Sequence, residues 1–285
     1  MPDANEPPAD VRSEDAKILW DANDLGPIPE ADWASYQRDA GAKAAALDAV
    51  VRKGFVVLRG VETTERRVLD VATSFGFVRD TNYGELFDVR IEANPVNLAF
   101  TGLPITPHTD NPYRDPVPTL QILHCLRNAT AGGDSGFVDA FKAAAVLRAE
   151  NPAAFDMLSR TEVTFTFASD DAELSATRPM IGLDPYGRIR EVRFNNRSMQ
   201  PVRLRSTDAV RFYDAYRAFA EVVNRPELQI VLRMQPGDCV IFDNVRLLHA
   251  RTGFEGEAGE RHLQGCYADL DGLESTLAIL RRGRG

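Results

Sequence analysis

Short runs of β-type residues recur along most of this chain, and their spacing limits the folds that it can adopt. From residue 85 onward, the runs alternate with turn signals such as Gly132-Gly133-Asp134 and Pro236-Gly237-Asp238. They occupy residues 87–91, 96–99, 120–126, 137–138, 163–167, 189–194, 229–234, 239–243 and 263–268. Many short strands with a few covering helices predict a mostly β fold with flanking helices, a distorted double-stranded β-helix or jelly roll.

Helical patterns are fewer than strand patterns. Apolar side chains at helical spacing predict helices over residues 31–53, 65–75, 207–224 and 273–280. Residues 1–16 contain five acids, one arginine and three prolines, a composition that predicts a disordered lead-in. Residues 17–285 are then expected to form a single domain, because neither an internal repeat nor a long linker interrupts them.

Charge and composition exclude several classes of protein. The net charge is −9 and the only basic run is the tail Arg281, Arg282 and Arg284, so we expect no nucleic-acid partner. No apolar stretch approaches the roughly 20 residues that a membrane span needs, and the N-terminus lacks a signal pattern. The three cysteines lie far apart inside apolar runs, which is typical of buried thiols in the cytoplasm.

The clearest chemical signal lies among the four histidines. His108 and Asp110 are two residues apart, and side chains at this spacing point to the same face of a strand. His249 follows the predicted strand 239–243 after a short loop. Two imidazoles and one carboxylate on one face of an ion leave three positions open, which is the facial triad suited to iron(II) and O2 chemistry. A His-x-Asp pair is common in sequences, and taken alone it is more typical of a surface turn than of a metal site.

Arg261 strengthens the metal hypothesis. It lies twelve residues beyond His249, at the start of the predicted strand 263–268. A 2-oxoglutarate co-substrate chelates iron through its keto acid end and needs a buried cation for its far carboxylate, which arginine can bind with two parallel hydrogen bonds. The alternative for a single arginine is a surface ion pair. His124 and His262 are expected to be structural or supporting residues.

Six longer segments carry a specific pattern. They are TPHTDNPY (106–113), LQILHCL (120–126), GGDSGFVD (132–139), PGD (236–238), FDNVRLLH (242–249) and RHLQGCYAD (261–269). Together they resemble the γ-butyrobetaine hydroxylase branch of the taurine dioxygenase superfamily, whose members are Fe(II)/2-oxoglutarate-dependent oxygenases. The resemblance runs from about residue 50 to residue 283, which is most of the chain.

The resemblance implies a set of site residues. Fe(II) would be held by His108, Asp110 and His249, and O2 would be the oxidant. Arg261 would hold the far carboxylate of the co-substrate 2-oxoglutarate, Ser135 would assist, and Leu123 would lie along it. Animal relatives carry an N-terminal zinc-binding domain, and we expect this chain to lack it. In the family, that domain often forms part of the dimer interface. The resemblance therefore allows a homodimer but does not predict its geometry.

The resemblance also implies a small-molecule substrate with a trimethylammonium group. A quaternary cation cannot donate hydrogen bonds, so aromatic ring faces are its best partners. The residues that resemble such a cage are Tyr83, Phe87, Phe100 and Tyr267. Phe87 replaces a tryptophan of the animal relatives. Core packing is the alternative interpretation, and it applies more to the phenylalanines than to the tyrosines, which carry a polar tip.

The anionic end of the substrate is implied to meet Asn97 and the Asn195-Asn196 pair, which Arg197 follows. The expected activity is therefore hydroxylation of an unactivated C–H in a betaine-type substrate such as γ-butyrobetaine. If Arg197 points inward, a phosphonate such as 2-(trimethylammonio)ethylphosphonate suits the site better, because a guanidinium helps a dianion more. A desaturase or demethylase using the same metal, or a non-enzymatic cupin-like binder, remains as an alternative.

Overall fold

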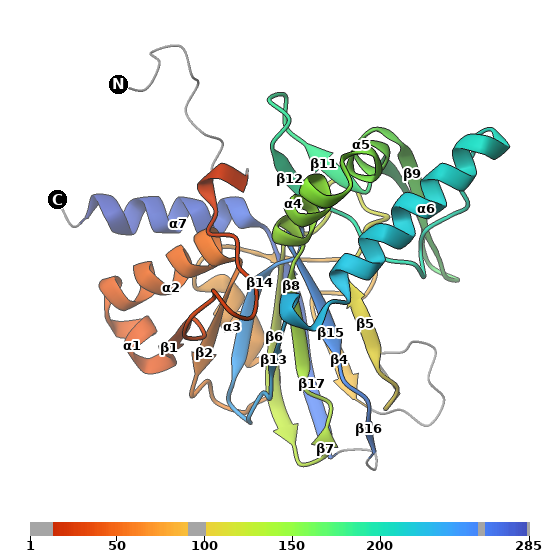
Figure 1. Ribbon diagram of the computed structural model, residues 1–285. Coiled ribbons are helices and arrows are strands. Elements are labelled where there is room, and N and C mark those ends of the chain that lie inside the picture. The colour runs from red at the N-terminus through yellow and green to blue at the C-terminus, as the bar shows by residue number, and fades with distance from the viewer. Residues whose placement is uncertain (1–13, 91–100, 256–259, 284–285) are drawn as a thin grey trace, which may run out of the picture.

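The computed structural model describes residues 14–90, 101–255 and 260–283, and Figure 1 shows β-sheets flanked by helices. The larger, seven-stranded sheet has the order β1 (Glu30–Asp32), β2 (Phe55–Arg59), β14 (Cys239–Asp243), β6 (Leu120–Asn128), β17 (Arg261–Ala268), β3 (Val78–Arg79), and β4 (Phe87–Arg90) also pairs with β17. The smaller sheet has the order β13 (Gln229–Leu232), β8 (Ser135–Asp139), β15 (Leu247–Arg251), β5 (Ile105–His108). The predicted double-stranded β-helix is confirmed.

Strand side chains alternate between two separate hydrophobic cores. In β14, Val240 and Phe242 lie in the core between the two sheets, whereas Cys239 and Ile241 lie in the core beneath the helices. β2 alternates in the same way. Because both faces of these central strands are buried, each strand appears in the sequence as a continuous apolar run and not as an apolar–polar alternation.

Helices cover the outer face of each sheet. One group packs on the larger sheet and comprises α1 (Trp33–Arg38), α2 (Ala40–Lys53), α3 (Arg67–Thr73) and α7 (Leu270–Arg282). The other group packs beside the smaller sheet and comprises α4 (Ala140–Glu150), α5 (Pro152–Arg160) and α6 (Ser206–Val223). The remaining elements are η1 (Glu14–Ala16), η3 (Pro226–Leu228) and the strand pairs β7 (Ala131–Gly132) with β16 (Phe254–Glu255), β9 (Glu162–Ala168) with β10 (Glu173–Pro179), and β11 (Ile181–Leu183) with β12 (Ile189–Val192).

The structure corrects several predicted elements. The helix expected over 31–53 is two helices, because Asp39 breaks the first and caps the second by accepting hydrogen bonds from Gly41 N and Ala42 N. The helices α4 and α5 were not predicted. Of the expected disordered lead-in, residues 14–16 form η1, and the rest lies outside the described residues. The expected strand over 96–99 also lies outside them.

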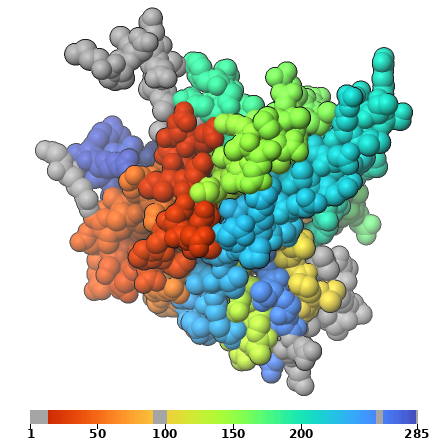
Figure 2. Space-filling model, viewed as in Figure 1, coloured from red at the N-terminus to blue at the C-terminus, as the bar shows by residue number. Residues whose placement is uncertain are grey.

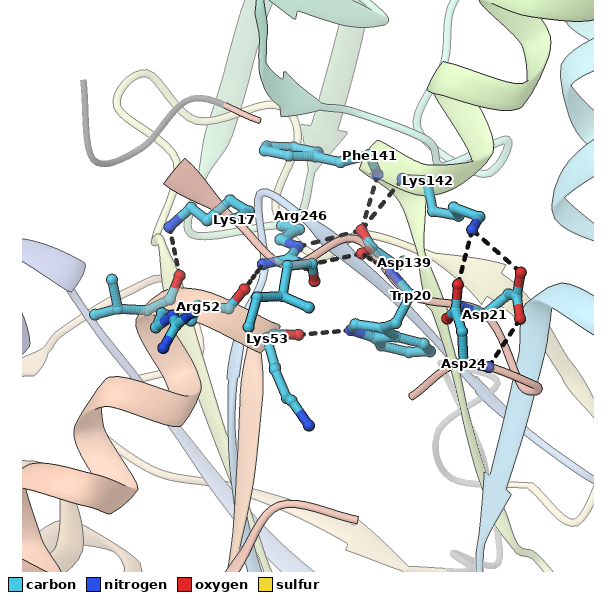
Figure 3. A network of polar contacts seen from close by, with 12 residues as sticks. Lys17, Trp20, Asp21, Asp24, Arg52, Lys53, Asp139, Phe141, Lys142 and Arg246 are labelled. Atoms are coloured by element: carbon cyan, nitrogen blue, oxygen red, sulfur yellow. Dashed lines mark hydrogen bonds and ion pairs between the residues drawn. The ribbon is translucent and has the colours of Figure 1, made fainter. Parts of the chain in front are cut away.

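A fully buried ion pair joins distant parts of the chain (Figure 3). Arg246, in the connection between β14 and β15, donates to both carboxylate oxygens of Asp139 at 3.2 and 2.7 Å, and neither side chain is exposed. Its remaining hydrogen bonds go to the carbonyls of Arg52 and Ile18 at 2.8 and 2.7 Å. Asp139 also caps α4 and accepts from Trp20 N. In Figure 2, the red segment after η1 accordingly lies between the orange α1–α2 helices and the green α4.

We expect Arg246→Met to destabilise the fold strongly, because it leaves the Asp139 carboxylate buried and unpaired. Breaking such a pair from one side typically costs about 3–5 kcal/mol. Urea denaturation measures the change in the free energy of unfolding. The matched control is Arg217→Met, which removes an exposed pair with Asp214 and should cost at most about 1 kcal/mol. Equal losses in the two variants would show that the buried pair contributes no more than a surface one.

Candidate active site

A cavity of about 430 Å³ lies between the two sheets. Its wall is built by residues of β4, β5, β6, β8, β9, β15 and β17, together with Tyr83, Asp110, Asn111, Tyr113, Asn195, Arg197 and Ser198. His108, Asp110 and His249 all line it. One ligand atom from each of these three residues lies within 4.8 Å of the others, which is close enough to hold one metal ion.

The pairing of β5 with β15 explains how the two histidines meet. His108 and His249 are register partners in these antiparallel strands, and their ring centroids are 4.2 Å apart. The Asp110 carboxylate completes the group, with Oδ1 3.4 Å from His108 Nε2 and Oδ2 3.8 Å from His249 Nε2. The sequence reasoning placed His108 and Asp110 on one strand, and that premise was wrong, because β5 ends at His108.

Two asparagines hold the irregular segment that carries Asp110. The Asn244 side chain accepts from Asp110 N and donates to Asp110 O, both at 2.9 Å, as a neighbouring strand would. Asn195 donates to Thr109 O at 2.9 Å. The backbone of Thr109 also bonds to Phe194 O. Asn244 is fully buried, so the position of the carboxylate is fixed even though no strand contains it.

Contacts around the three residues set their charge and orientation. His108 Nδ1 lies 2.9 Å from Thr106 O, which leaves Nε2 for a metal. Burial opposes ionisation of Asp110, but His249, His108 and a 2.9 Å hydrogen bond from Tyr267 Oη hold the pKa of that carboxyl well below its ordinary value. Burial and then His108 lower the pKa of His249 to about 3. A charged carboxylate beside a neutral imidazole is the protonation state that binds a divalent cation.

Arg261 lies in the cavity wall at the start of β17, and part of its guanidinium is free to bind a ligand. Its side chain is buried and donates from Nη2 to Gly133 O at 3.0 Å, while Nε and Nη1 have no partner among the described residues. Gly133 has a positive φ of 71°, and a Cβ there would lie 2.9 Å from Arg261 Nε, so only glycine fits. Two buried unpaired N–H groups on one guanidinium suit a carboxylate. Ser135 and Leu123 also line the cavity.

Sequence reasoning missed a second buried arginine in this wall. Arg251 is two residues beyond His249 on β15, and that spacing was the signal that could have found it. Its guanidinium donates to Thr101 O and Leu103 O. Burial, reinforced by the nearby Arg261, lowers the pKa of Arg251 to about 10. Arg251 and Arg261 are neighbouring cations in the cavity wall, and they favour an anionic ligand beside them.

Aromatic side chains form another part of the wall. Tyr83, Phe87 and Tyr267 all line the cavity, and the Phe87 and Tyr267 rings are 5.1 Å apart. Two further rings, Tyr113 and Phe167, were not predicted. They stack at 5.1 Å, and Tyr113 Oη lies 3.1 Å from Tyr83 Oη. Two predicted substrate residues, Asn97 and Phe100, lie outside the described residues.

The predicted anion-binding residues are not all brought to the cavity. Asn195 and Arg197 line it, but the Asn196 side chain is exposed and does not. His262 bonds to Asp88 at 2.6 Å, which fits its expected supporting role. His124 is fully buried in β6, away from the cavity, which fits a structural role. All three cysteines are free and buried, as expected.

Comparison with known proteins places the chain among oxygenases. The family model "Taurine catabolism dioxygenase TauD, TfdA family" matches residues 20–267. Gamma-butyrobetaine dioxygenase of Pseudomonas sp. (strain AK-1) is 38% identical over 255 residues, covering 90% of this chain and 67% of the relative. The Homo sapiens enzyme of that name is 35% identical, covering 83% and 62%. The chain therefore spans about two thirds of the length of these relatives.

Solved structures share the fold at lower identity. One is an asparagine oxygenase in complex with Fe(II), 2S,3S-3-hydroxyasparagine and succinate. It matches with a TM-score of 0.61 at 18% identity, and the match covers 83% of this chain and 80% of that one. AAD-2 in complex with Mn(II) and N-oxalylglycine matches with a TM-score of 0.60 at 16% identity, and the match covers 80% of this chain and 89% of that one.

Within the described residues, no helix is long and apolar enough to cross a membrane.

We expect Asn244→Leu to weaken divalent-metal binding by about 10–100-fold, the usual effect of losing a group that orients a ligand. The substitution keeps the side-chain size but removes both bonds to the Asp110 backbone. Titration with Co(II), followed by its visible absorption, measures the affinity without turnover. Asn224→Leu, on the exposed end of α6, is the control and should bind as the parent does. Unchanged Co(II) affinity in a folded Asn244→Leu protein would show that Asp110 needs no such clamp.

Proposed function

The chain belongs to the taurine catabolism dioxygenase TauD, TfdA family, and we propose that it is an Fe(II)/2-oxoglutarate-dependent dioxygenase that hydroxylates a small trimethylammonium substrate such as γ-butyrobetaine. One observation carries the proposal. A His-Asp-His group, a buried arginine with two unpaired donors, and an aromatic wall all face one cavity. Each of these features suits a different ligand of such an enzyme.

The donor set fits iron and its co-substrate. His108, Asp110 and His249 would hold Fe(II) on one face, and three protein ligands leave room for O2 and a chelating keto acid. Arg261 would pair with the far carboxylate of 2-oxoglutarate, with Ser135 and Leu123 beside it. Bound iron supplies the activation of O2, coupled to conversion of 2-oxoglutarate to succinate and CO2. The protein would contribute the placement of the substrate relative to the metal.

The aromatic wall supports a quaternary ammonium substrate. Tyr83, Phe87, Tyr113, Phe167 and Tyr267 present ring faces and edges to the cavity. The Tyr267 hydroxyl is committed to Asp110, so this residue offers the substrate its ring and not its polar tip. The first two relatives compared above are named for γ-butyrobetaine, whose cation is a trimethylammonium group. Cation–π attraction would hold that group while the metal faces a methylene of the chain.

The function is tested by incubating the protein with Fe(II), 2-oxoglutarate and a panel of trimethylammonium acids. We expect a betaine to stimulate succinate release and to gain one oxygen by mass spectrometry. The neutral tert-butyl isostere of γ-butyrobetaine should be a much poorer substrate, since it lacks the charge that the rings attract. His249→Ala should abolish turnover. Product without added oxygen would indicate desaturation or demethylation, and no succinate with any substrate would favour a non-enzymatic binder.

We expect Arg261→Leu to weaken 2-oxoglutarate binding by about 2–5 kcal/mol, much of it the penalty for a buried unpaired carboxylate. Calorimetry with Mn(II) under anaerobic conditions measures this binding separately from catalysis. Arg233→Leu is the control, because Arg233 pairs with Asp134 nearby but its side chain is 38% exposed. If 2-oxoglutarate binds equally well to both variants, another residue holds its far carboxylate.

A further inference from the structure

Two buried donors in the cavity wall have no partner. Asn111 Nδ2 and Ser198 Oγ make no hydrogen bond in the described structure, although their residues are only 3% and 7% exposed. Both residues line the cavity. A buried polar atom without a partner costs about 1–3 kcal/mol, and native proteins keep few of them. These atoms therefore point to a ligand with acceptor oxygens.

The Asn111 side chain is oriented by its neighbours. Its Oδ1 accepts from Tyr113 Oη at 2.8 Å, and Tyr113 Oη also contacts Tyr83 Oη at 3.1 Å. Because Oδ1 is occupied by a donor, the free end of the amide is the N–H donor. The same chain of hydroxyls links Asn111 to the aromatic wall. The cation and the anion of one small substrate would thus be held by connected side chains.

Arg197 supplies the charge beside Ser198. Arg197 lines the cavity, and no acidic side chain of the described residues pairs with it. The turn that presents both residues is held by Asn195, whose Oδ1 accepts from Arg197 N at 3.1 Å, while Ser198 O accepts from Thr166 N at 2.8 Å.

The predicted asparagine pair is less suited to this task. Asn195 already donates to Thr109 O and accepts from Arg197 N, so its amide is used to shape the site. Asn196, unlike the likewise exposed Arg197, does not line the cavity. From these contacts we infer that the oxyanion head group of the substrate is bound by Asn111, Arg197 and Ser198, with Asn195 as a positioning residue. This inference rests on the proposed function.

The same three residues bear on the nature of the head group. Two neutral donors satisfy the two oxygens of a carboxylate. A phosphonate has three acceptor oxygens and up to two charges, so a forked guanidinium adds more to it than to a carboxylate. An oxyanion is the shared chemistry of both ligands. The size of the Arg197 contribution to each ligand distinguishes them.

The test measures binding with Mn(II) and 2-oxoglutarate under anaerobic conditions, so that no turnover occurs. The probes are γ-butyrobetaine, 2-(trimethylammonio)ethylphosphonate and the neutral primary amide of γ-butyrobetaine. We expect Ser198→Ala to weaken binding of both acids by about three- to tenfold, and Arg197→Gln by at least about tenfold. The amide should be almost indifferent to Arg197→Gln. A larger loss for the phosphonate than for the carboxylate would identify the dianion as the better-matched head group.

Control variants separate this subsite from the rest of the proposal. Asn111→Asp keeps the shape of the side chain, and aspartate tolerates the φ of 55° at this position. It replaces the N–H donor with a negative charge, so it should weaken the binding of both acids more than Ser198→Ala does. Asn196→Ala should change nothing. Suppose that the parent hydroxylates a betaine, and that Arg197→Gln and Ser198→Ala bind all three probes as tightly as the parent does. The assignment of the head group to these residues is then wrong, while the proposed function stands. If the parent binds no trimethylammonium acid, both proposals fall.

Discussion

The short connection between β14 and β15 is the constraint on which the site depends most. Its three residues include Asn244, which clamps the backbone of Asp110, and Arg246, which forms the buried pair with Asp139. His249 follows on β15, in register with His108. An ion pair buried in this way adds little net stability compared with apolar packing, but it is costly to break from one side. Its effect here is to fix where the connection lies, and with it two of the three candidate ligands.

A second part of the cavity wall carries two buried positive charges. Arg261 and Arg251 are both buried, and burial lowers the pKa of each. Gly133 O accepts from Arg261 Nη2, whereas Arg261 Nε and Nη1 have no partner among the described residues. A carboxylate bound to Arg261 would pair these N–H groups and so remove the free-energy cost of burying them without partners. Because a ligand that binds only the folded state stabilises it by mass action, this part of the protein should be more stable with an anion present.

Sequence reasoning recovered the parts of the site that depend on local pattern. His108, Asp110, His249 and Arg261 were chosen by residue type and spacing, and the structure brings them to one cavity. The strand assumed for His108 and Asp110 was wrong, since Asp110 is placed by side chains distant in the sequence. Helices α4 and α5 were missed. The buried residues of α4 are mainly alanines, with Phe141 and Leu147, so its apolar stripe is weak in the sequence although alanine favours helix.

The missed residues share one physical feature, which is that their roles come from long-range contacts. Nothing near Asn244 in the sequence shows that its amide would bond to a backbone 134 residues away. Tyr113 and Phe167 lie 54 positions apart and meet only because β9 packs against the segment after β5. Asn195 was predicted to bind the anionic end of the substrate and it does line the cavity, but only its contacts show that the amide is already occupied. Spacing therefore identifies candidate ligands, whereas long-range packing determines which polar groups remain free to bind one.

The distribution of charge offers a reason why two different anions would be sorted within one cavity. On the proposed assignment, 2-oxoglutarate has an acid at each end and no cation, so it matches the metal and Arg261. The substrate has one cation and one anion, matching the rings and Arg197. Exchanging the two would place a quaternary ammonium beside Arg261 and Arg251, where like charges repel at low dielectric. It would also leave a carboxylate against aromatic faces, whose quadrupole disfavours an anion. Selectivity would thus follow from the cation of the substrate, which the aromatic rings attract and which Arg261 and Arg251 repel.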